Sequence, residues 1–234
     1  MTAPETLDED VTWGIGRYWR GNRAVSLRVP LARMRQDTEF AVWVLKDLAV
    51  VPERPLVIAF SSADGAQLSP FEYAARHLRV PYAAVEPSTY DAGRLVMFCR
   101  GLRPSAVVGV REELLSGLAE LGTSIAECFA NAGTVLAFPS AVPALAEAGV
   151  AVRRLLPLGP TVAVECASGG LHVSSAWSLG DGDAADGMEV SSADGAPELA
   201  RVPTGIAGTA VQVACSCGRG GQRLELERSA DVWA

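Results

Sequence analysis

Two pairs of potential metal ligands lie in the last third of the chain. Cys166 and His172 are separated by five residues, and Cys215 and Cys217 are separated by one. Three thiolates and one imidazole are a standard tetrahedral zinc set of the closed, structural kind, with no position left for water. Soft sulfur ligands favour zinc over magnesium or calcium. We therefore predict a structural Zn²⁺ held by these four side chains.

A second interpretation stays open, namely that these residues are buried small hydrophobic groups and one satisfied histidine. Free cysteine is often buried, and we interpret Cys99 and Cys128 as core residues for that reason. Glycines near the four residues favour the metal. The pair Gly169-Gly170 allows a tight return between the first two ligands, and Gly218 lets the chain turn away after the last.

Strands alternate with helices as far as about residue 160. This alternation predicts right-handed crossovers and a parallel sheet. In the second helix we expect Ser69 to be the cap and Pro70 to be the first helical residue. The expected helices are 31–50, 69–78, 88–102, 111–122 and 140–149, and the expected strands are 55–62, 80–87, 105–110, 134–139 and 151–159.

Beyond about residue 160 the pattern changes to short strands separated by Gly/Asp turns, which is typical of antiparallel sheet. The expected strands are 161–167, 170–177, 186–192, 210–216 and 222–227, so the C-x-C pair falls on an apolar strand. The predicted fold class is α/β, with a parallel βαβ subdomain followed by a small antiparallel β subdomain. The expected divisions are a tail at 1–20, an α/β subdomain at 21–160 and a β-rich subdomain at 161–234.

Composition excludes several classes of protein. Hydrophobic residues make up 49% of the 234 residues, which is enough for a sizeable core. The net charge of −7 disfavours nucleic acid, which requires a basic stripe. No apolar run could span a bilayer, and residues 1–10 lack a signal-peptide pattern. We expect a cytoplasmic protein whose clustered cysteines bind metal or act in catalysis instead of forming disulfides.

Two late segments, "VAVECASGGLHV" and "RVPTGIAGTAVQVACSCGR", resemble the later part of phenylacetate–coenzyme A ligases. These ligases belong to the adenylate-forming acyl-CoA synthetase superfamily. The segment "VPYAAVEPSTYDAGRLVMFCRGLRPSAVVGV" resembles the central α/β subdomain of that family. The resemblance covers most of residues 20–233 and is specific in the late motifs. It implies part of the large N-terminal domain of an adenylate-forming enzyme, and some relatives have a similar Cys/His arrangement.

The resemblance also implies a set of ATP-binding parts, and this sequence departs from them. The segment matching the phosphate loop, "TWGIGRYWRGNRAV", keeps glycines but has gained Trp13, Tyr18 and Trp19, whose rings would crowd a phosphate. The family's magnesium-binding glutamate should precede "VAVEC", but this chain has no acid there before Glu165. We therefore expect the phosphate and magnesium sites to be lost. We therefore interpret residues 1–20 as an N-terminal tail and a remnant of the phosphate-loop region.

Two further parts differ from the family pattern. Ile206 follows Thr204-Gly205 where the family has an aspartate that holds the ribose hydroxyls. The mobile C-terminal lid should carry a catalytic lysine, but the chain ends where that lid would begin, and its one lysine is Lys46 on an early helix. We therefore expect no ATP cofactor and no ATP-dependent ligation.

Three functions remain open on this basis. The first is a catalytically degenerate homologue that acts as an accessory or binding protein in a biosynthetic pathway, with an acyl, CoA-thioester or carrier-protein ligand. The second is a repurposed, ATP-independent enzyme acting on an acyl or polyketide-like substrate in the old acyl pocket. The third is an interaction module whose site is completed by a partner protein or a homodimer. A family fold does not by itself decide among them.

A few polar residues are candidates for the ligand site. Tyr90, Asp91 and Arg94 lie near a helix start and would form a polar patch at the old acyl pocket. The alternative for Asp91 is compensation of the helix dipole. His77 and Glu86 would join them in a repurposed enzyme, although no pair has a diagnostic acid–base spacing, and His77 also fits a plain helix surface.

Overall fold

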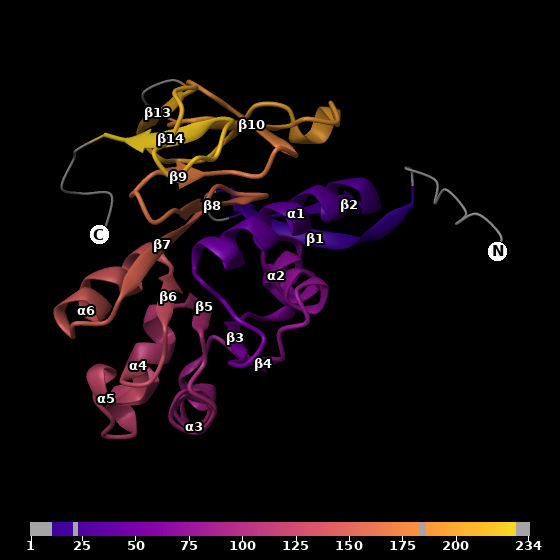
Figure 1. Cartoon of the computed structure of the whole chain (residues 1–234). Helices are drawn as coiled ribbons and strands as arrows, with labels where there is room; N and C mark the ends of the chain where they lie inside the picture. The colour runs from indigo at the N-terminus through magenta and orange to yellow at the C-terminus, as the bar shows by residue number, and fades with distance from the viewer. Residues whose placement is uncertain (1–10, 21–22, 183–185, 228–234) are drawn as a thin grey trace.

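The computed structural model describes residues 11–20, 23–182 and 186–227 (Figure 1). Its helices are α1 Leu31–Asp47, α2 Gly65–His77, α3 Ala92–Leu102, α4 Glu112–Glu120, α5 Ile125–Phe129 and α6 Val142–Glu147. The first strands are β1 Thr12–Arg20, β2 Arg23–Pro30, β3 Leu56–Ala59, β4 Tyr82–Val85, β5 Ala106–Val110, β6 Thr134–Ala137 and β7 Val152–Pro157. The later ones are β8 Val162–Glu165, β9 Leu171–His172, β10 Trp177–Gly180, β11 Glu189–Ser192, β12 Val202–Pro203, β13 Gly208–Val211 and β14 Arg223–Leu226.

One mixed sheet organises the described residues. Its nine strands run in the order β13-β14-β9-β8-β7-β6-β5-β3-β4. From β4 to β7 the neighbours are parallel, and from β7 to β13 they are antiparallel. The predicted α/β class is therefore confirmed. The sheet is continuous through β7, which pairs in parallel with β6 and antiparallel with β8.

The helices cover both faces of the parallel part of the sheet, because each has one apolar side. Helices α1 and α2 pack on one face through Phe40, Leu45 and Phe71. Helices α3 to α6 contribute Leu95, Leu118 and other buried residues to a core on the opposite face. The inner parallel strands β3, β5 and β6 are buried on both faces, which is why they read as continuous apolar runs.

A third core joins the two ends of the chain. The hairpin of β1 and β2 packs its inner residues, Tyr18 and Leu27, into a cluster that includes Trp177 and Val190. The last two lie on a separate three-stranded sheet, β10-β11-β12. Figure 1 shows this indigo hairpin beneath the orange and yellow strands. Long-range packing thus places the N-terminal aromatic segment beside the late β segment.

Two local expectations are corrected. Helix α2 begins at Gly65 instead of Ser69, because Ser61 and Asp64 form a capping box one turn earlier. The Ser61 N–H donates to Asp64 Oδ2 at 3.1 Å, and Ser61 Oγ accepts from the Ala63 N–H at 3.2 Å. The short helix α5 was not predicted, although Ser124 and Glu127 form a capping box at its start. No helix within the described ranges has the length and apolar character needed to cross a bilayer.

Candidate metal centre and ligand cavity

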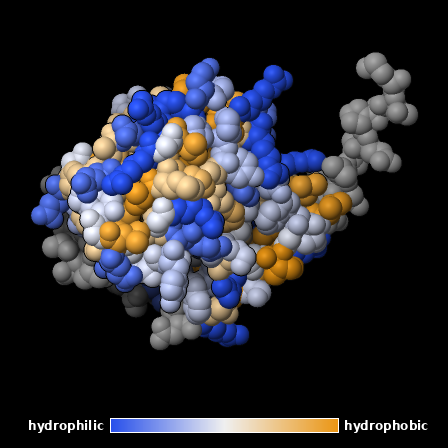
Figure 2. All heavy atoms as spheres, turned by 90° about the horizontal axis from the view of Figure 1, so that it is seen from below, coloured by the Kyte–Doolittle hydropathy of each residue, from blue (hydrophilic) through white to orange (hydrophobic). Residues whose placement is uncertain are grey.

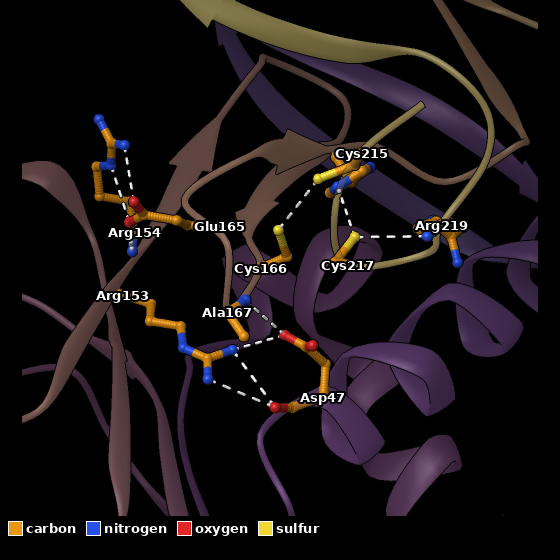
Figure 3. A network of polar contacts seen from close by, with 10 residues as sticks. Asp47, Arg153, Arg154, Glu165, Cys166, Ala167, Cys215, Cys217 and Arg219 are labelled. Atoms are coloured by element: carbon orange, nitrogen blue, oxygen red, sulfur yellow. Dashed lines mark hydrogen bonds and ion pairs between the residues drawn. The ribbon is translucent and has the colours of Figure 1, made fainter. Parts of the chain in front are cut away.

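The four residues predicted as zinc ligands come together at one end of the antiparallel strands. The ligand atoms of Cys166, His172, Cys215 and Cys217 all lie within 4.8 Å of one another. Cys166 follows β8, His172 lies in β9, and the C-x-C pair lies between β13 and β14. Figure 3 shows the three sulfur atoms directed toward one another. The cluster therefore joins two hairpins that are far apart in sequence.

The position of the C-x-C pair corrects the sequence analysis, which put it inside a strand. Strand β13 ends at Val211, and the two cysteines lie in a turn. In this turn the Gly218 N–H donates to the Cys215 carbonyl at 2.9 Å, and the Arg219 N–H lies 3.5 Å from Cys217 Sγ. The φ of +81° at Gly218 shows that the backbone is not extended here, and an extended strand could not make these local bonds.

The turns on the two sides of the cluster match each other. The Gly169 N–H donates to the Cys166 carbonyl at 2.9 Å, as Gly218 does to Cys215. Gly169 has a φ of +80°, a conformation that favours glycine. A Cβ at Gly170 would lie 3.0 Å from Cys215 Sγ and 3.3 Å from His172 Nε2. The predicted role of these glycines as close turns around the ligands is confirmed.

Two of the separations between ligand atoms match those of a tetrahedral site, and all four atoms lie within 4.8 Å of one another. A zinc–sulfur bond of about 2.3 Å and tetrahedral angles place two sulfur ligands roughly 3.8 Å apart. Cys166 Sγ and Cys215 Sγ are 3.7 Å apart, and Cys217 Sγ lies 3.4 Å from His172 Nε2. All three cysteines are free thiols. The set is thus suited to hold a metal ion before any rearrangement.

The electrostatic surroundings of the cluster favour the metal-binding protonation state at His172 and Cys215 and oppose it at Cys217. Burial and the positive charges of Arg219 and Arg223 lower the pKa of His172, which keeps its imidazole neutral. Hydrogen bonding from the Cys217 backbone lowers the pKa of Cys215 to about 7. Burial raises the pKa of Cys217 to about 11. The two arginines also offset the net negative charge of a site with three thiolates and one divalent ion.

Helix α1 supports the cluster from below. Asp47, at the end of α1, accepts from the Ala167 N–H at 2.9 Å and pairs with Arg153 at 2.6 Å (Figure 3). The edge of the Trp43 ring faces His172 at a centroid distance of 5.3 Å. Arg219 stacks on Trp43 with its guanidinium carbon 4.5 Å from the ring centroid. The His172 Nδ1 atom is buried without a hydrogen-bond partner.

The other residues singled out in the sequence lie elsewhere. Asp91 accepts from the Glu86 N–H at 2.7 Å and pairs with Arg94 at 3.3 Å, so it organises the start of α3. Tyr90 is 99% exposed, and His77 lies exposed at the end of α2. The structure does not bring these side chains to a common cavity. Cys99 and Cys128 are fully buried, which confirms their expected place in the core.

A cavity of about 390 Å³ opens at the carboxyl ends of β3, β5, β6 and β7. In α/β proteins this edge of the sheet is the usual place for a ligand. The lining residues are Arg17, Tyr18, Trp19, Ser61, Ala63, Asp64, Gln67, Leu68, Arg111, Phe138, Pro157, Gly159, Val162 and Thr204. The sequence alone does not indicate this set, because its members come from six separate segments.

The polar groups of the cavity are partly used by one another. Arg111 pairs with Asp64 at 2.6 Å and stacks over the Phe138 ring at 4.0 Å. Gln67 donates through Nε2 to the Arg17 and Gly159 carbonyls. Two buried polar atoms lack a partner, Gln67 Oε1 and Arg111 Nε. Both atoms are buried within the wall of the cavity.

The residues that differ from the pattern of the resembled family lie at separate places in the structure. Glu165 accepts two bonds from the Arg154 guanidinium, at 2.8 and 2.9 Å, and does not line the cavity (Figure 3). Thr204 lines the cavity, whereas Ile206 packs against the hairpin core. Lys46 is exposed near the end of α1. Asp64 is the one acidic residue among the described residues that line the cavity.

The mixed sheet and its two helical layers define an α/β fold with a cavity at the sheet edge. No family model matches the sequence, and no curated protein matches it. Solved structures of adenylate-forming acyl-CoA ligases do share its fold. One is 2-hydroxyisobutyryl-CoA ligase in its postadenylation state, with a TM-score of 0.67 and 13% identity over 93% of this chain and 51% of that chain.

Two further structures extend the comparison. Malonyl-CoA ligase, with methylmalonyl-CoA and AMP bound, has a TM-score of 0.57 and 14% identity over 95% of this chain and 54% of that chain. The N-terminal subdomain of NpsA from Klebsiella oxytoca, in complex with anthranilyl-AMSN, has a TM-score of 0.53 and 11% identity over 90% of this chain and 57% of that chain. This chain therefore has the fold of part of the N-terminal domain of such ligases and spans about half their length.

Proposed function

We propose that this protein is a catalytically degenerate homologue of adenylate-forming ligases, of the phenylacetate–coenzyme A ligase type. In this proposal it binds an acyl group, carried as a free acid, a CoA thioester or a carrier-protein thioester, without ATP-dependent ligation. It would serve as an accessory protein in a biosynthetic pathway. The observation that carries the proposal is the acid-poor cavity, whose single described carboxylate is paired with Arg111.

Loss of adenylation follows from the chemistry of magnesium. Mg²⁺ bridging ATP phosphates is usually bound through one or two carboxylates. Asp64 is held by Arg111, and Glu165 is held by Arg154 outside the cavity. Ile206 offers no acceptor to a ribose hydroxyl, and its side chain packs into an apolar cluster. None of these groups provides the oxygen ligands that ATP chemistry requires.

The cavity suits the acyl part of a ligand. Trp19 and Phe138 provide aromatic surface, and Arg17 and Arg111 provide positive charge at the same wall. A planar or apolar acyl group ending in a carboxylate or thioester carbonyl would match both features. We therefore place the ligand here, and not at Tyr90, Asp91 and Arg94, which the structure puts at the start of α3.

Calorimetry on the purified protein tests this proposal. We expect no heat from ATP with magnesium, alone or with a panel of aryl and fatty acids. We expect binding of at least one free acid or CoA thioester, weakened at least tenfold by Ala63→Trp, which fills the cavity. The control is Ala126→Trp on α5, away from the cavity. Clear ATP binding would contradict the proposal.

We further propose that the Cys/His cluster holds one structural Zn²⁺. The set has three thiolates and one neutral imidazole at tetrahedral separations, and it leaves no ligand position for a substrate. The metal would fasten the β8–β9 and β13–β14 hairpins together and so contribute folding free energy. Free thiols in a reducing, cytoplasmic compartment fit this chemistry.

Metal analysis tests the zinc proposal. The wild-type protein should contain one zinc per chain, and Cys166→Ser should lose both zinc and stability. Cobalt substitution should give the visible absorption of tetrahedral thiolate coordination. The control is Cys128→Ser, a buried thiol outside the cluster, which should reduce stability and keep the zinc. Unchanged zinc content in Cys166→Ser would contradict the assignment.

A second candidate function is an ATP-independent enzyme that acts on an acyl or polyketide-like substrate in the same cavity. The unpartnered Gln67 Oε1 and Arg111 Nε favour it, because buried polar atoms without partners can orient a substrate. Nucleotide-free turnover of an acyl thioester that is lost in Gln67→Leu would favour this function over simple binding.

A further inference from the structure

The charge of the first hairpin is opposite to that of the protein as a whole. The chain has a net charge of −7, yet residues 11–36 contain six arginines and no acidic residue. The arginines are Arg17, Arg20, Arg23, Arg28, Arg33 and Arg35. Four of them lie on β1 and β2 and are exposed. A local concentration of one sign of charge of this kind is a feature of surfaces that recognise a charged partner.

The hairpin has two distinct faces. Gly16, Tyr18 and Leu27 turn inward to the core. The opposite face consists of three cross-strand pairs, Ile15 with Arg28, Arg17 with Ser26, and Trp19 with Ala24. Residues paired in this way project from the same side of the hairpin. We call this set the outer face of the hairpin.

Large apolar side chains are exposed on the outer face beside the arginines. Ile15 is 72% exposed and Trp19 is 61% exposed. The guanidinium carbon of Arg17 lies 5.8 Å from the centre of the Trp19 ring. Figure 2 shows hydrophobic and strongly hydrophilic atoms side by side at the end of the molecule near the N-terminal trace. Tryptophan and arginine are the residues most enriched at the centres of protein interfaces.

We propose that the outer face of the hairpin docks an acidic, helical surface of a partner protein. The eight residues of β2 give a pre-formed platform about 26 Å long, which matches roughly five turns of a helix. The arginines would pair with carboxylates of the partner, and Ile15 and Trp19 would pack on its apolar side chains. The proposal does not depend on the zinc site, whereas Arg17 and Trp19 are shared with the cavity.

The observations favour a protein over a nucleic acid. Ile15 and Ala24 contribute aliphatic surface that a phosphate backbone does not contact favourably. The rest of the chain is acidic and would repel a long polyanion that extends beyond the hairpin. A protein partner with a local acidic helix meets the basic strip without crossing the acidic remainder.

The test uses the full-length chain, because residues 1–10 carry four acidic side chains close in sequence to the same arginines. The probe is a fluorescein-labelled amphipathic helical peptide with glutamates on one side and leucines beside them. Fluorescence anisotropy is measured at about 50 and about 200 mM salt. We expect binding that weakens roughly tenfold over this range, as screening of charge pairs requires.

Variants separate docking from unspecific charge attraction. Arg17→Glu should weaken the peptide at least tenfold, and Trp19→Ala at least fivefold without a change of charge. Because Arg17 and Trp19 also line the cavity, Ile15→Ala, which lies outside it, should weaken the peptide about threefold. The matched controls are Arg100→Glu and Met97→Ala on α3, which make the same types of change at exposed positions and should leave binding unchanged.

Several results would overturn the proposal. These are absence of peptide binding at low salt, or equal weakening by Arg100→Glu and Arg17→Glu. Tighter binding of a DNA duplex than of the peptide, lost in Arg17→Glu, would identify a nucleic-acid surface instead. A homo-oligomer in sedimentation that Ile15→Ala dissociates would show that the face is occupied by a second copy.

Discussion

The Cys/His cluster and the sheet-edge cavity lie on the same nine-stranded sheet but use their polar groups differently. In the cluster, three thiols and an imidazole point at a common centre, and His172 Nδ1 has no partner. In the cavity, the charged groups Arg111 and Asp64 neutralise each other at 2.6 Å. The cluster groups could hold a metal ion, whereas the two charged groups of the cavity are paired with each other.

This difference has a structural origin. The cluster is built from two short turns, each with a cysteine followed by a glycine three residues later, so local backbone conformation already aims the ligands. The residues that line the cavity come from six separate segments.

The largest expected effect is removal of the proposed metal. Chelation of wild-type protein should lower the melting temperature by about 10 °C or more, because ligation free energy is part of the folding free energy. Differential scanning fluorimetry with and without chelator measures this. Cys166→Ser should be insensitive to chelator, and a wild-type protein that is equally insensitive would break the contrast between the two regions.

Gly109→Ala tests the sheet beneath the cavity. Gly109 has a φ of +88°, and a Cβ there would lie 2.2 Å from the Ala59 carbonyl oxygen, so β3 and β5 would be pushed apart. We expect a loss of about 2–4 kcal/mol in the free energy of unfolding, measured with denaturant, and no loss of zinc. Gly101→Ala on α3, where no atom lies within 4 Å, is the control and should be neutral or stabilising.

Asp37 on α1 should give the protein a pH dependence independent of the metal. Burial raises the pKa of its carboxyl to about 6, partly countered by hydrogen bonds from Ser174 and Trp177. Since the folded-state pKa is the higher one, this group stabilises the protein below about pH 4 and loses that contribution as pH rises through about 6.

The variant Asp37→Asn should remove that decline, because an amide does not ionise. Its oxygen can still accept from Trp177 Nε1, which lies 3.2 Å from Asp37 Oδ1 in the wild-type protein. The side chain keeps part of its surface exposed, so we expect a gain of about 1–2 kcal/mol at pH 7, less than the full shift implies. Urea unfolding at pH 4 and pH 7 measures it. A difference between variant and wild type that does not grow with pH would contradict the assignment.

Gly170→Ala gives the smallest and most local effect. Its Cβ would lie 3.0 Å from Cys215 Sγ, so the ligands must shift by a few tenths of an ångström. We expect about a tenfold loss of zinc affinity, measured by competition with a chromophoric chelator. Gly180→Ala on β10, where no atom lies within 4 Å, should keep wild-type affinity. Equal affinity in both variants would show that the cluster is looser than its contacts indicate.

Much of the fold could be predicted because its signals are local. Buried parallel strands such as 105–110 read as apolar runs, and helices between them have capping and glycine signals. The start of α2 was misplaced because Ser69-Pro70 imitates a helix start, while the capping box of Ser61 and Asp64 is stabilised from outside by Arg111. The continuity of the sheet through β7 has no local signal, since it depends on pairing with β8.

The sequence by itself determined the ligand types, their spacing and the glycines around them, because those choices are set by metal chemistry and backbone conformation. It also contains the departures from the pattern of the family that it resembles, such as Ile206 after Thr204-Gly205. Only the tertiary structure decided that the two cysteine turns face each other, that Asp64 is neutralised by Arg111, and that the N-terminal arginines form one exposed face. These outcomes depend on contacts between segments that are far apart in sequence, as are Arg33 and Asp194, which pair across 161 residues. Residue spacing carries no information about such contacts.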